Sequence, residues 1–417
     1  MGSNRASRRC LLLFAFLLLI VALTFAAGGS VLAAPATIYV NAAAAGADTG
    51  TSWADAYQDL QDALATAASG DQIWVATGTY WPTPGTDRTV SFELKSEVAL
   101  YGGFPASGDP EWVDRDWVAN ETILSGDLVT EGDTSDNSYR VVVCVNHTGA
   151  VLDGFTITGG NADGPLTLSP PSPAPVDRYD CGAGVYSEGN ATFRHLVIES
   201  NQTRTGTDNA DSRLGGGGMM LYYSTAVLDD VTFRNNSVTR VSPLSATGCG
   251  GGLLIAGAFA PALHLVTFAN NQAEGHGGGL YVRDGSAVLD DVVFEENRAT
   301  HGGGIYFYTG GATVKNAVFK NNEAVSQGGA IKVDGQNVSD TTTLANCLFA
   351  GNYCSENSVT LGGALNVAAY NVEVSNSTFT QNSAYAGGAV AVLPDHDPHL
   401  TLTNSILLGK HRDNSHP

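Results

Sequence analysis

Short apolar runs separated by turn residues recur along most of this chain. Residues 302–322 (GGGIYFYTGGATVKNAVFKNN) begin with a glycine cluster, continue with the apolar runs IYF, ATV and AVF, and end with an Asn three positions after a Phe. Alternating apolar and polar positions are typical of β-strands, and Gly and Asn between such runs are typical of tight turns. The stretch therefore predicts three short strands joined by turns, with no helix.

The same template recurs from Cys181 onward, with 25 to 35 residues between successive Phe positions. A repeat of this length without a helical period is the signature of a solenoid, in which each unit stacks on the next. The glycine clusters begin at Gly182, Gly216, Gly251, Gly277, Gly302, Gly328, Gly362 and Gly387, and the closing pairs are Phe233/Asn236, Phe268/Asn271, Phe294/Asn297, Phe319/Asn322, Phe349/Asn352 and Phe379/Asn382. We therefore predict an all-β fold, a single-stranded parallel β-helix with three short strands per coil.

Stacked coils place equivalent residues in columns about 4.8 Å apart. We expect the Phe side chains to stack in the core and the glycines to adopt positive φ angles. We expect each Asn amide to bond the backbone and the Asn of the next coil. A polar residue three positions before the Phe predicts a second bend, at Asp230, Asp291, Asn316, Asn346 and Asn376.

The N-terminal part of the predicted mature chain differs from the repeats. Ser52 and Asp55 form a capping box, apolar residues follow at helical spacing, and Gly70 supplies a stop, so residues 53–68 predict an amphipathic helix that caps the end of the stack. Strands are expected over residues 72–80, 91–104, 122–128 and 139–145. We divide the chain into an export signal (1–36), a cap with the first coils (37–147), a repeat β-helix (148–408) with a Pro-rich loop (163–180), and an irregular tail (409–417).

Residues 1–36 have the features of a secretory signal peptide. Arg5, Arg8 and Arg9 precede the apolar run 11–27, and Ala34-Pro35-Ala36 fits a cleavage site before Thr37. The alternative, a retained membrane anchor, is less favoured because the apolar run is short for a spanning helix. We therefore expect a protein that is secreted or held at the cell surface.

The chain carries a formal net charge of −21, which argues against nucleic acid as a partner and makes calcium a more suitable one. Asp127, Glu131, Asp133 and Asp136 form the densest acidic loop and are the candidate calcium ligands, although a solvated acidic loop explains them as well. The predicted mature chain has five Cys residues, an odd number that argues against a fully paired disulfide framework. Most are expected to be buried thiols, with Cys347 and Cys354 as a candidate pair.

The repeated GG[AG][ILV] and F-x-x-N motifs resemble the repeats of the chlamydial polymorphic outer membrane proteins. More broadly, the chain resembles secreted bacterial right-handed parallel β-helix proteins of the pectin-lyase-like superfold, and the resemblance covers most of residues 37–408. It implies a right-handed helix and a surface role. The polymorphic family also carries a C-terminal membrane barrel, for which this chain shows no strands, so we expect a truncated or freely secreted product.

Alternation along the first strand of each coil separates outward from inward positions. The outward columns are Tyr186, Met220, Leu254, Tyr281, Tyr306, Lys332, Asn366 and Ala391, and then Glu188, Tyr222, Ala256, Arg283, Tyr308, Asp334, Ala368 and Leu393. Within them, Tyr281, Arg283, Tyr306, Tyr308, Lys332 and Asp334 form a compact aromatic and charged patch, which we name the first-strand patch. Aromatic faces and cations suit sugars. A solvated sheet face explains the same residues and is favoured over a binding site.

No catalytic set is assembled in the sequence. A hydrolase of this fold needs carboxylates on adjacent coils, whereas Asp229-Asp230 and Asp290-Asp291 coincide with the predicted bends. His276 and His301 are expected to be neighbours but make a weak metal site. We therefore predict a protein with an adhesive, structural or carbohydrate-contacting role, toward carbohydrate or a host or cell-surface ligand. The alternative is a calcium-dependent polysaccharide lyase or glycoside hydrolase that acts on the outer face of the first strands.

Overall fold

The computed structural model describes residues 34–164, 179–205, 215–240, 248–257, 259–335, 341–355, 360–368, 371–393 and 398–411. The backbone divides into Met1–Pro35 and Ala36–Pro417, and the fold described below belongs to the second part. Most of the predicted export signal, and residues 165–178 of the predicted Pro-rich loop, lie outside the described residues. Within those residues, no helix has the length and apolar character needed to cross a membrane.

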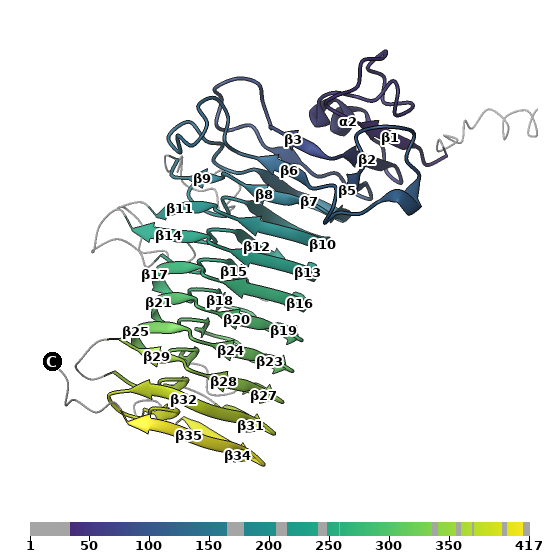
Figure 1. Ribbon diagram of the computed structural model, residues 1–417. Helices are drawn as coiled ribbons and strands as arrows, with labels where there is room; N and C mark the ends of the chain where they lie inside the picture. Colours follow the sequence, from purple (N-terminus) through teal and green to yellow (C-terminus); the bar gives the residue numbers. More distant parts are fainter. Residues whose placement is uncertain are drawn as a thin grey trace, which may run out of the picture. The chain divides into compact units, whose positions relative to one another are not determined.

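The second part is a parallel β-helix whose coils stack in chain order (Figure 1). The coil that begins at Gly302 contains β22 (Ile305–Phe307), β23 (Ala312–Lys315), β24 (Val318–Lys320) and β25 (Glu323–Gln327). The first three are the predicted strands, and the fold class is confirmed. The regular coil nevertheless has four strands rather than three, because the segment after the Asn bend also pairs with its neighbours, as Glu323 does with Tyr353.

Equivalent strands stack into four faces, numbered in the order in which each coil visits them. The first face contains β4 (Phe92–Glu93), β12 (Met219–Ser224), β15 (Leu253–Ala256), β18 (Leu280–Arg283), β22, β26 (Ile331–Val333), β30 (Leu365–Val367) and β33 (Val390–Val392). The second face contains β1 (Thr37–Val40), β2 (Gln72–Ala76), β5 (Ala99–Phe104), β19 (Ala287–Asp290), β23, β27 (Thr341–Ala345), β31 (Asn371–Ser375) and β34 (His399–Thr403). The long strands β7 (Val142–Asp153) and β10 (Val185–Glu199) pass from the first face to the second, so the cap and the repeat region are continuous at residue 148.

The third and fourth faces complete the coil. The third contains β3 (Gly78–Tyr80), β6 (Thr122–Ser125), β8 (Thr156–Thr158), β20 (Val293–Glu295), β24, β28 (Leu348–Ala350) and β35 (Ile406–His411). The fourth contains β9 (Asn161–Ala162), β11 (Gln202–Thr205), β14 (Ser237–Arg240), β17 (Gln272–His276), β21 (Arg298–His301), β25 and β29 (Tyr353–Cys354). β10, β13 (Val227–Arg234) and β16 (Ala262–Ala269) continue from the second face into the third, and β32 (Thr378–Ala384) from the third into the fourth.

The predicted turns have the expected backbone conformations. Gly302 has φ +61°, and a Cβ atom there would lie 2.3 Å from the carbonyl oxygen of Ile305, so only glycine fits. The predicted second bends also have positive φ, between +50° and +57° at Asp230, Asp291, Asn316, Asn346 and Asn376. Asn and Asp tolerate this left-handed region better than other non-glycine residues, which explains the polar residue three positions before each Phe.

The predicted core columns are confirmed. The rings of Phe233, Phe268, Phe294, Phe319, Phe349 and Phe379 stack in sequence, with centroids 4.4 to 5.0 Å apart. The closing Asn residues are fully buried, and each from Asn236 to Asn352 donates an amide hydrogen bond from Nδ2 to the Oδ1 atom of the next Asn. The two columns therefore set the register of every coil, one by packing and the other by hydrogen bonds.

The predicted capping helix is present but shorter than expected. Among the described residues the single α-helix is α2 (Leu60–Thr66), with Asp59 rather than Ser52 as its N-cap. Ser52 and Asp55 do bond each other, but in a turn, because the chain at Tyr57 extends to pair with Val40 beside β1. The apolar side of α2 packs into the main core, as expected for a cap.

Two further predictions are wrong. Residues 409–411 of the predicted irregular tail belong to β35, which pairs with β32; the rest of the tail lies outside the described residues. Cys347 and Cys354 form no disulfide, and all five Cys residues in the described part of the chain are buried thiols, as predicted for most of them. Cys347 Sγ instead lies 3.4 Å from the carbonyl oxygen of Ala345 in its own bend.

Candidate functional site

From Tyr186 to Tyr306, the first outward column of the first face is closed to solvent, contrary to expectation. In the first predicted outward column, exposure is 0% for Tyr186, Met220 and Leu254, 1% for Tyr281 and 3% for Tyr306. These side chains form a second apolar core with Cys181, Tyr222, Cys249 and Ala256. The alternation of the strand is as predicted, but its outward positions are not exposed.

The cover comes from the fourth strands. β17, β21 and β25 end at His276, His301 and Gln327, directly before glycine turns, and these last side chains lie beside Tyr306 and Lys332 of the first face. The His276 ring stacks on Tyr306 with 4.4 Å between centroids, and Gln327 accepts a hydrogen bond from Lys332 Nζ at 2.7 Å. Where these side chains cover the first face, no open groove is left for a polymer. The predicted enzyme action on the outer face of the first strands therefore has no support.

The first-strand patch comes together, but as a largely buried network. Tyr306 donates a hydrogen bond to Asp334 at 2.8 Å, and Lys332 lies 3.1 Å from the same carboxylate. Burial alone would raise the pKa of Asp334, yet Lys332 and the hydrogen bonds outweigh it, and the pKa lies below its ordinary value. Tyr281 lies beside Tyr306, while Arg283 and Tyr308 remain partly exposed at the edge.

His276 and His301 are neighbours, as predicted, with centroids 5.2 Å apart. Burial, with Lys332 nearby, lowers the pKa of His276 to about 4 and the pKa of His301 to about 3, so both imidazoles are neutral at ordinary pH. The Nδ1 atoms of both rings are buried without a hydrogen-bond partner among the described residues. The pair is part of the cover of the first face.

The structure does not assemble the predicted calcium ligands. Within the described residues, no three His, Cys, Asp or Glu side chains converge as a metal site requires. Asp127 and Asp136 instead each use one oxygen to accept a backbone N–H of their own loop, from Gly132 and Thr130. Glu131 and Asp133 are exposed. The conformation of this acidic loop is therefore held by hydrogen bonds from its own backbone N–H groups to its own carboxylates.

A different part of the molecule gathers aromatic and charged side chains. Along the second face, the outward column runs from Tyr39 through Trp74 and Tyr101 to Asp153 and Arg194. The segment after β5 folds back beside this column and contains the 3₁₀ helix η1 (Trp112–Asp114). It is anchored where Asp116 N bonds the carbonyl of Gly103 and Trp53 Nε1 bonds the carbonyl of Pro110. The segment carries Trp112, Arg115 and Trp117 to the column.

Arg115, Asp153 and His195 form one chain of contacts. Arg115 Nη2 lies 2.5 Å from Asp153 Oδ1, and both side chains are almost fully buried. His195 Nδ1 lies 2.8 Å from the same Asp153 oxygen. Because an ionised carboxylate only accepts hydrogen bonds, Asp153 fixes the proton on Nδ1 and leaves Nε2 of the neutral ring as an acceptor. A Cβ atom at Gly154, which has φ +83°, would lie 2.4 Å from Arg115 Nη2, so the glycine admits this arrangement.

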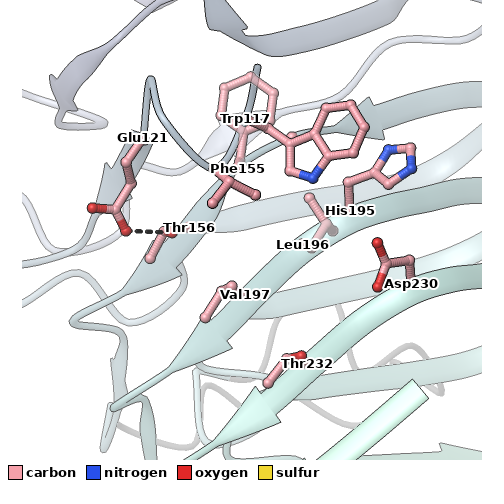
Figure 2. A pocket seen from close by; sticks show the side chains of 11 residues that line it. Trp117, Glu121, Phe155, Thr156, His195, Leu196, Val197, Asp230 and Thr232 are labelled. Atoms are coloured by element: carbon pink, nitrogen blue, oxygen red, sulfur yellow. Dashed lines mark hydrogen bonds between the residues drawn. The ribbon is translucent and has the colours of Figure 1, made fainter. Parts of the chain in front are cut away.

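Trp117 and His195 form one side of a cleft of about 280 Å³ (Figure 2), which we name the Trp117 cleft. Their rings stack with centroids 4.0 Å apart. Glu121 forms another side and accepts a hydrogen bond from Thr156 at 2.9 Å. Asp230 and Thr232 also contribute, and none of the side chains that line the cleft in the described part of the chain is Lys or Arg. An aromatic face beside carboxylates and hydroxyls can bind a hydroxyl-rich, uncharged or cationic ligand.

Sequence reasoning had not found this site. Asp230 was predicted only as a bend residue, and neither His195 nor Trp117 stands out from the repeat pattern. The signal was present, because His195 occupies the bend position that other coils give to Asp or Asn, and its φ is +48°. Trp117 comes from an excursion of the chain whose path no repeat pattern specifies.

A second cavity, of about 470 Å³, lies over the start of the first face. Val143 and Val145 line it, together with Glu93, Arg140 and Tyr179. The Arg140 guanidinium is already engaged, since it bonds the carbonyl of Cys181 and lies over the Tyr186 ring. The Trp117 cleft, with an aromatic wall and an oriented imidazole, is the stronger candidate.

Comparison with known proteins supports the fold. In solved structures, the chain is similar to the pectin methylesterase from Aspergillus niger (15% identity, 91% of this chain and 87% of that chain covered, TM-score 0.30). It is also similar to the GH136 lacto-N-biosidase from Eubacterium ramulus (10% identity, 89% and 68% covered, TM-score 0.31). These likenesses are too distant to inform activity, and no curated protein matches the chain. Residues 134–337 and 251–409 match the right-handed β-helix region, so the chain belongs to that family.

Proposed function

We propose that this right-handed β-helix protein is exported and binds saccharides in the Trp117 cleft. The observation that carries the proposal is the Trp117 ring, held against His195 at the side of a cleft that also presents Glu121, Asp230 and Thr232. Aromatic rings bind the apolar faces of sugars, and carboxylates and hydroxyls bind their hydroxyl groups. An adhesive role toward cell-surface glycans is compatible with the same site. The resemblance to the polymorphic outer membrane proteins also supports an adhesive role.

The charge of the cleft narrows the ligand class. Glu121 and Asp230 line it without a Lys or Arg among the described lining residues, and the whole chain carries a net charge of −21. Like charges repel, and more strongly where water is partly excluded. Neutral sugars and amino sugars are therefore the proposed ligands, in preference to uronic acids.

Binding can be tested by titration calorimetry with neutral, amino-bearing and uronic oligosaccharides. We expect the first two classes to bind, and Trp117→Ala to weaken binding about tenfold, the equivalent of about 1.4 kcal/mol. Trp81→Ala is the matched control, because Trp81 is exposed (45%) and does not line the cleft. Equal binding by the Trp117→Ala variant and the unchanged protein would contradict the proposal.

The His195–Asp153 pair favours a second candidate, acid–base cleavage of the bound saccharide. Asp153 orients His195 so that Nε2 can accept a proton, as a hydrolase requires of the general base that activates water. The enzyme would act in the Trp117 cleft rather than on the covered first face. Release of reducing ends that is lost in His195→Gln, while binding is kept, would support it. Binding without release of reducing ends would mean that the protein binds saccharides but does not cleave them.

Export is the remaining part of the proposal and rests on residues 1–36, with their basic start, apolar run and small-residue cleavage motif. N-terminal sequencing of the protein recovered from the medium or cell surface should begin at Thr37. Recovery of the full chain with residues 1–36 attached would favour the membrane-anchor alternative.

A further inference from the structure

We infer that the Trp117 cleft is one end of a longer binding track, and that Trp112 forms a second platform on which the same saccharide chain stacks. The inference rests on the proposed function and deepens it. It assigns the ligand to polysaccharides or long oligosaccharides of neutral or amino sugars, rather than to single sugar units.

The first argument is the position of Trp112 relative to Trp117. The guanidinium carbon of Arg115 lies 5.3 Å from the centroid of the Trp112 ring and 5.1 Å from that of Trp117. The two centroids are therefore at most about 10 Å apart. A distance within this bound is spanned by a short oligosaccharide. Both residues belong to the same folded-back segment, and both rings contact the Arg115 side chain.

The second argument is that Trp112 is exposed and yet rigidly held. It is 47% exposed, while its ring packs against the rings of Tyr101 (centroids 4.8 Å apart, 88° between planes) and Trp74 (5.6 Å, 50°). A large apolar side chain left half in water gives up burial energy that the fold could otherwise use. A ring that is already fixed loses little conformational freedom when a ligand stacks on it, which favours binding.

The third argument concerns the residue between the two rings. Arg115 is almost fully buried, and its guanidinium is occupied by Asp153 and by the carbonyl of Gly102. The charge of Arg115 is therefore neutralised within the protein and does not attract an anionic ligand. Exposed acidic residues flank the segment at Glu111, Asp114 and Asp116. The track as a whole thus presents two rings in an acidic setting, which suits a neutral or amino-bearing chain.

The test compares ligand lengths on single variants of the full chain. Calorimetric titrations use disaccharides and hexasaccharides of the cello- and chito-series, with the unchanged protein, Trp112→Ala, Trp112→Tyr, Trp117→Ala and Trp81→Ala. We expect Trp112→Ala to weaken hexasaccharide binding about five- to tenfold and to leave disaccharide binding unchanged. Trp112→Tyr, which keeps a ring, should restore most of the loss. Trp117→Ala should weaken both lengths, and Trp81→Ala neither.

The outcomes separate this inference from the proposed function. Two results would overturn the second platform but not the binding site in the Trp117 cleft. One is equal affinity of the unchanged protein for hexasaccharides and disaccharides. The other is hexasaccharide affinity that Trp112→Ala does not change. A failure of every saccharide to bind, or no effect of Trp117→Ala, would overturn the proposed function itself. If Trp112→Ala weakened both lengths equally and lowered the melting temperature, Trp112 would be a packing residue of the cleft and the inference would be wrong.

Discussion

The buried asparagines connect neighbouring coils through side-chain hydrogen bonds. Asn271 Oδ1 accepts hydrogen bonds from both the backbone N and the Nδ2 of Asn236. Its own Nδ2 donates to the carbonyl of Phe233 and to Asn297 Oδ1. Every polar atom of this buried amide is therefore paired, which is the condition under which a polar group can occupy a core without a large penalty.

Replacing one member of this column should be costly, because its neighbours lose partners that water cannot replace. We expect Asn271→Ala to lower the free energy of unfolding by about 3 kcal/mol, measured by urea denaturation. Gln272→Ala is the control, since Gln272 is adjacent and exposed, and should change stability by less than about 0.5 kcal/mol. A similar loss of unfolding free energy in both variants would show that the Asn column does not contribute more to stability than a surface residue does.

At this scale, the sequence predicted what local rules determine. Asn316 and Asn322 were placed at bends because few other residues accept those backbone angles or bond so readily to the main chain, and both positions are as expected. The exposure of Tyr306 was predicted wrongly, because outward orientation on a strand does not imply contact with water. Whether another segment lies above depends on the tertiary path of the chain.

Among the elements, the fourth strands have two roles. β17 and β21 pair with each other as part of the β-helix wall. Their last residues, His276 and His301, lie over the first face beside Tyr306. Their burial excludes the protonated form, as the lowered pKa values of both rings indicate. The cover is therefore most stable when these imidazoles are neutral.

This arrangement predicts a loss of stability in mild acid. Below the ordinary His pKa of 6.5 the unfolded chain binds protons that the folded chain excludes until about pH 4 or lower, so the free energy of unfolding should fall as pH falls through this window. The slope is at most about 1.4 kcal/mol per pH unit for each His. Urea midpoints measured at about pH 7.5 and about pH 5 should converge in the double variant His276→Gln/His301→Gln.

The control for this pH effect is His264→Gln. His264 is exposed, and its hydrogen bond with Asp229 raises its pKa, so its removal should not reduce the loss of stability in acid. If the double variant kept the full pH dependence of the unchanged protein, the two covering His residues would not be its source.

The element-level comparison also shows why the candidate site was missed. The strands follow a repeated pattern that can be counted along the chain, whereas the segment with Trp112 and Trp117 is an excursion that this pattern does not specify. Its destination depends on contacts such as Asp116 with Gly103 and Arg115 with Asp153. Arg115 and Asp153 lie 38 residues apart in sequence and become neighbours only once β7 has paired with β5.

In the whole molecule, contacts pass mainly from each coil to the next, as the stepwise strand pairings show. Stability in such a structure is close to a sum of coil and interface contributions. Removal of residues 302–327 would join His301 to Gly328 and bring Phe294 opposite Phe349 and Asn297 opposite Asn352. All core columns would then continue with one coil fewer.

We therefore expect the protein without residues 302–327 to fold with a β-type circular dichroism spectrum. Its saccharide affinity should be unchanged, because the residues of the Trp117 cleft all precede residue 233. Deletion of residues 302–314 is the control, since it removes only part of a coil and breaks the columns; it should give aggregated or unfolded protein. If the whole-coil deletion behaved like the partial one, the coils would not be independent units.

All five tryptophans of the chain lie between residues 53 and 117, and four of them, Trp53, Trp74, Trp112 and Trp117, belong to the aromatic surroundings of the folded-back segment. The long stack of later coils contains none. Tryptophan fluorescence, excited selectively, therefore observes only one end of the molecule, while circular dichroism observes its whole length. Melting curves that coincide in the two signals would indicate that the coils unfold together, and curves that separate would locate the weaker end.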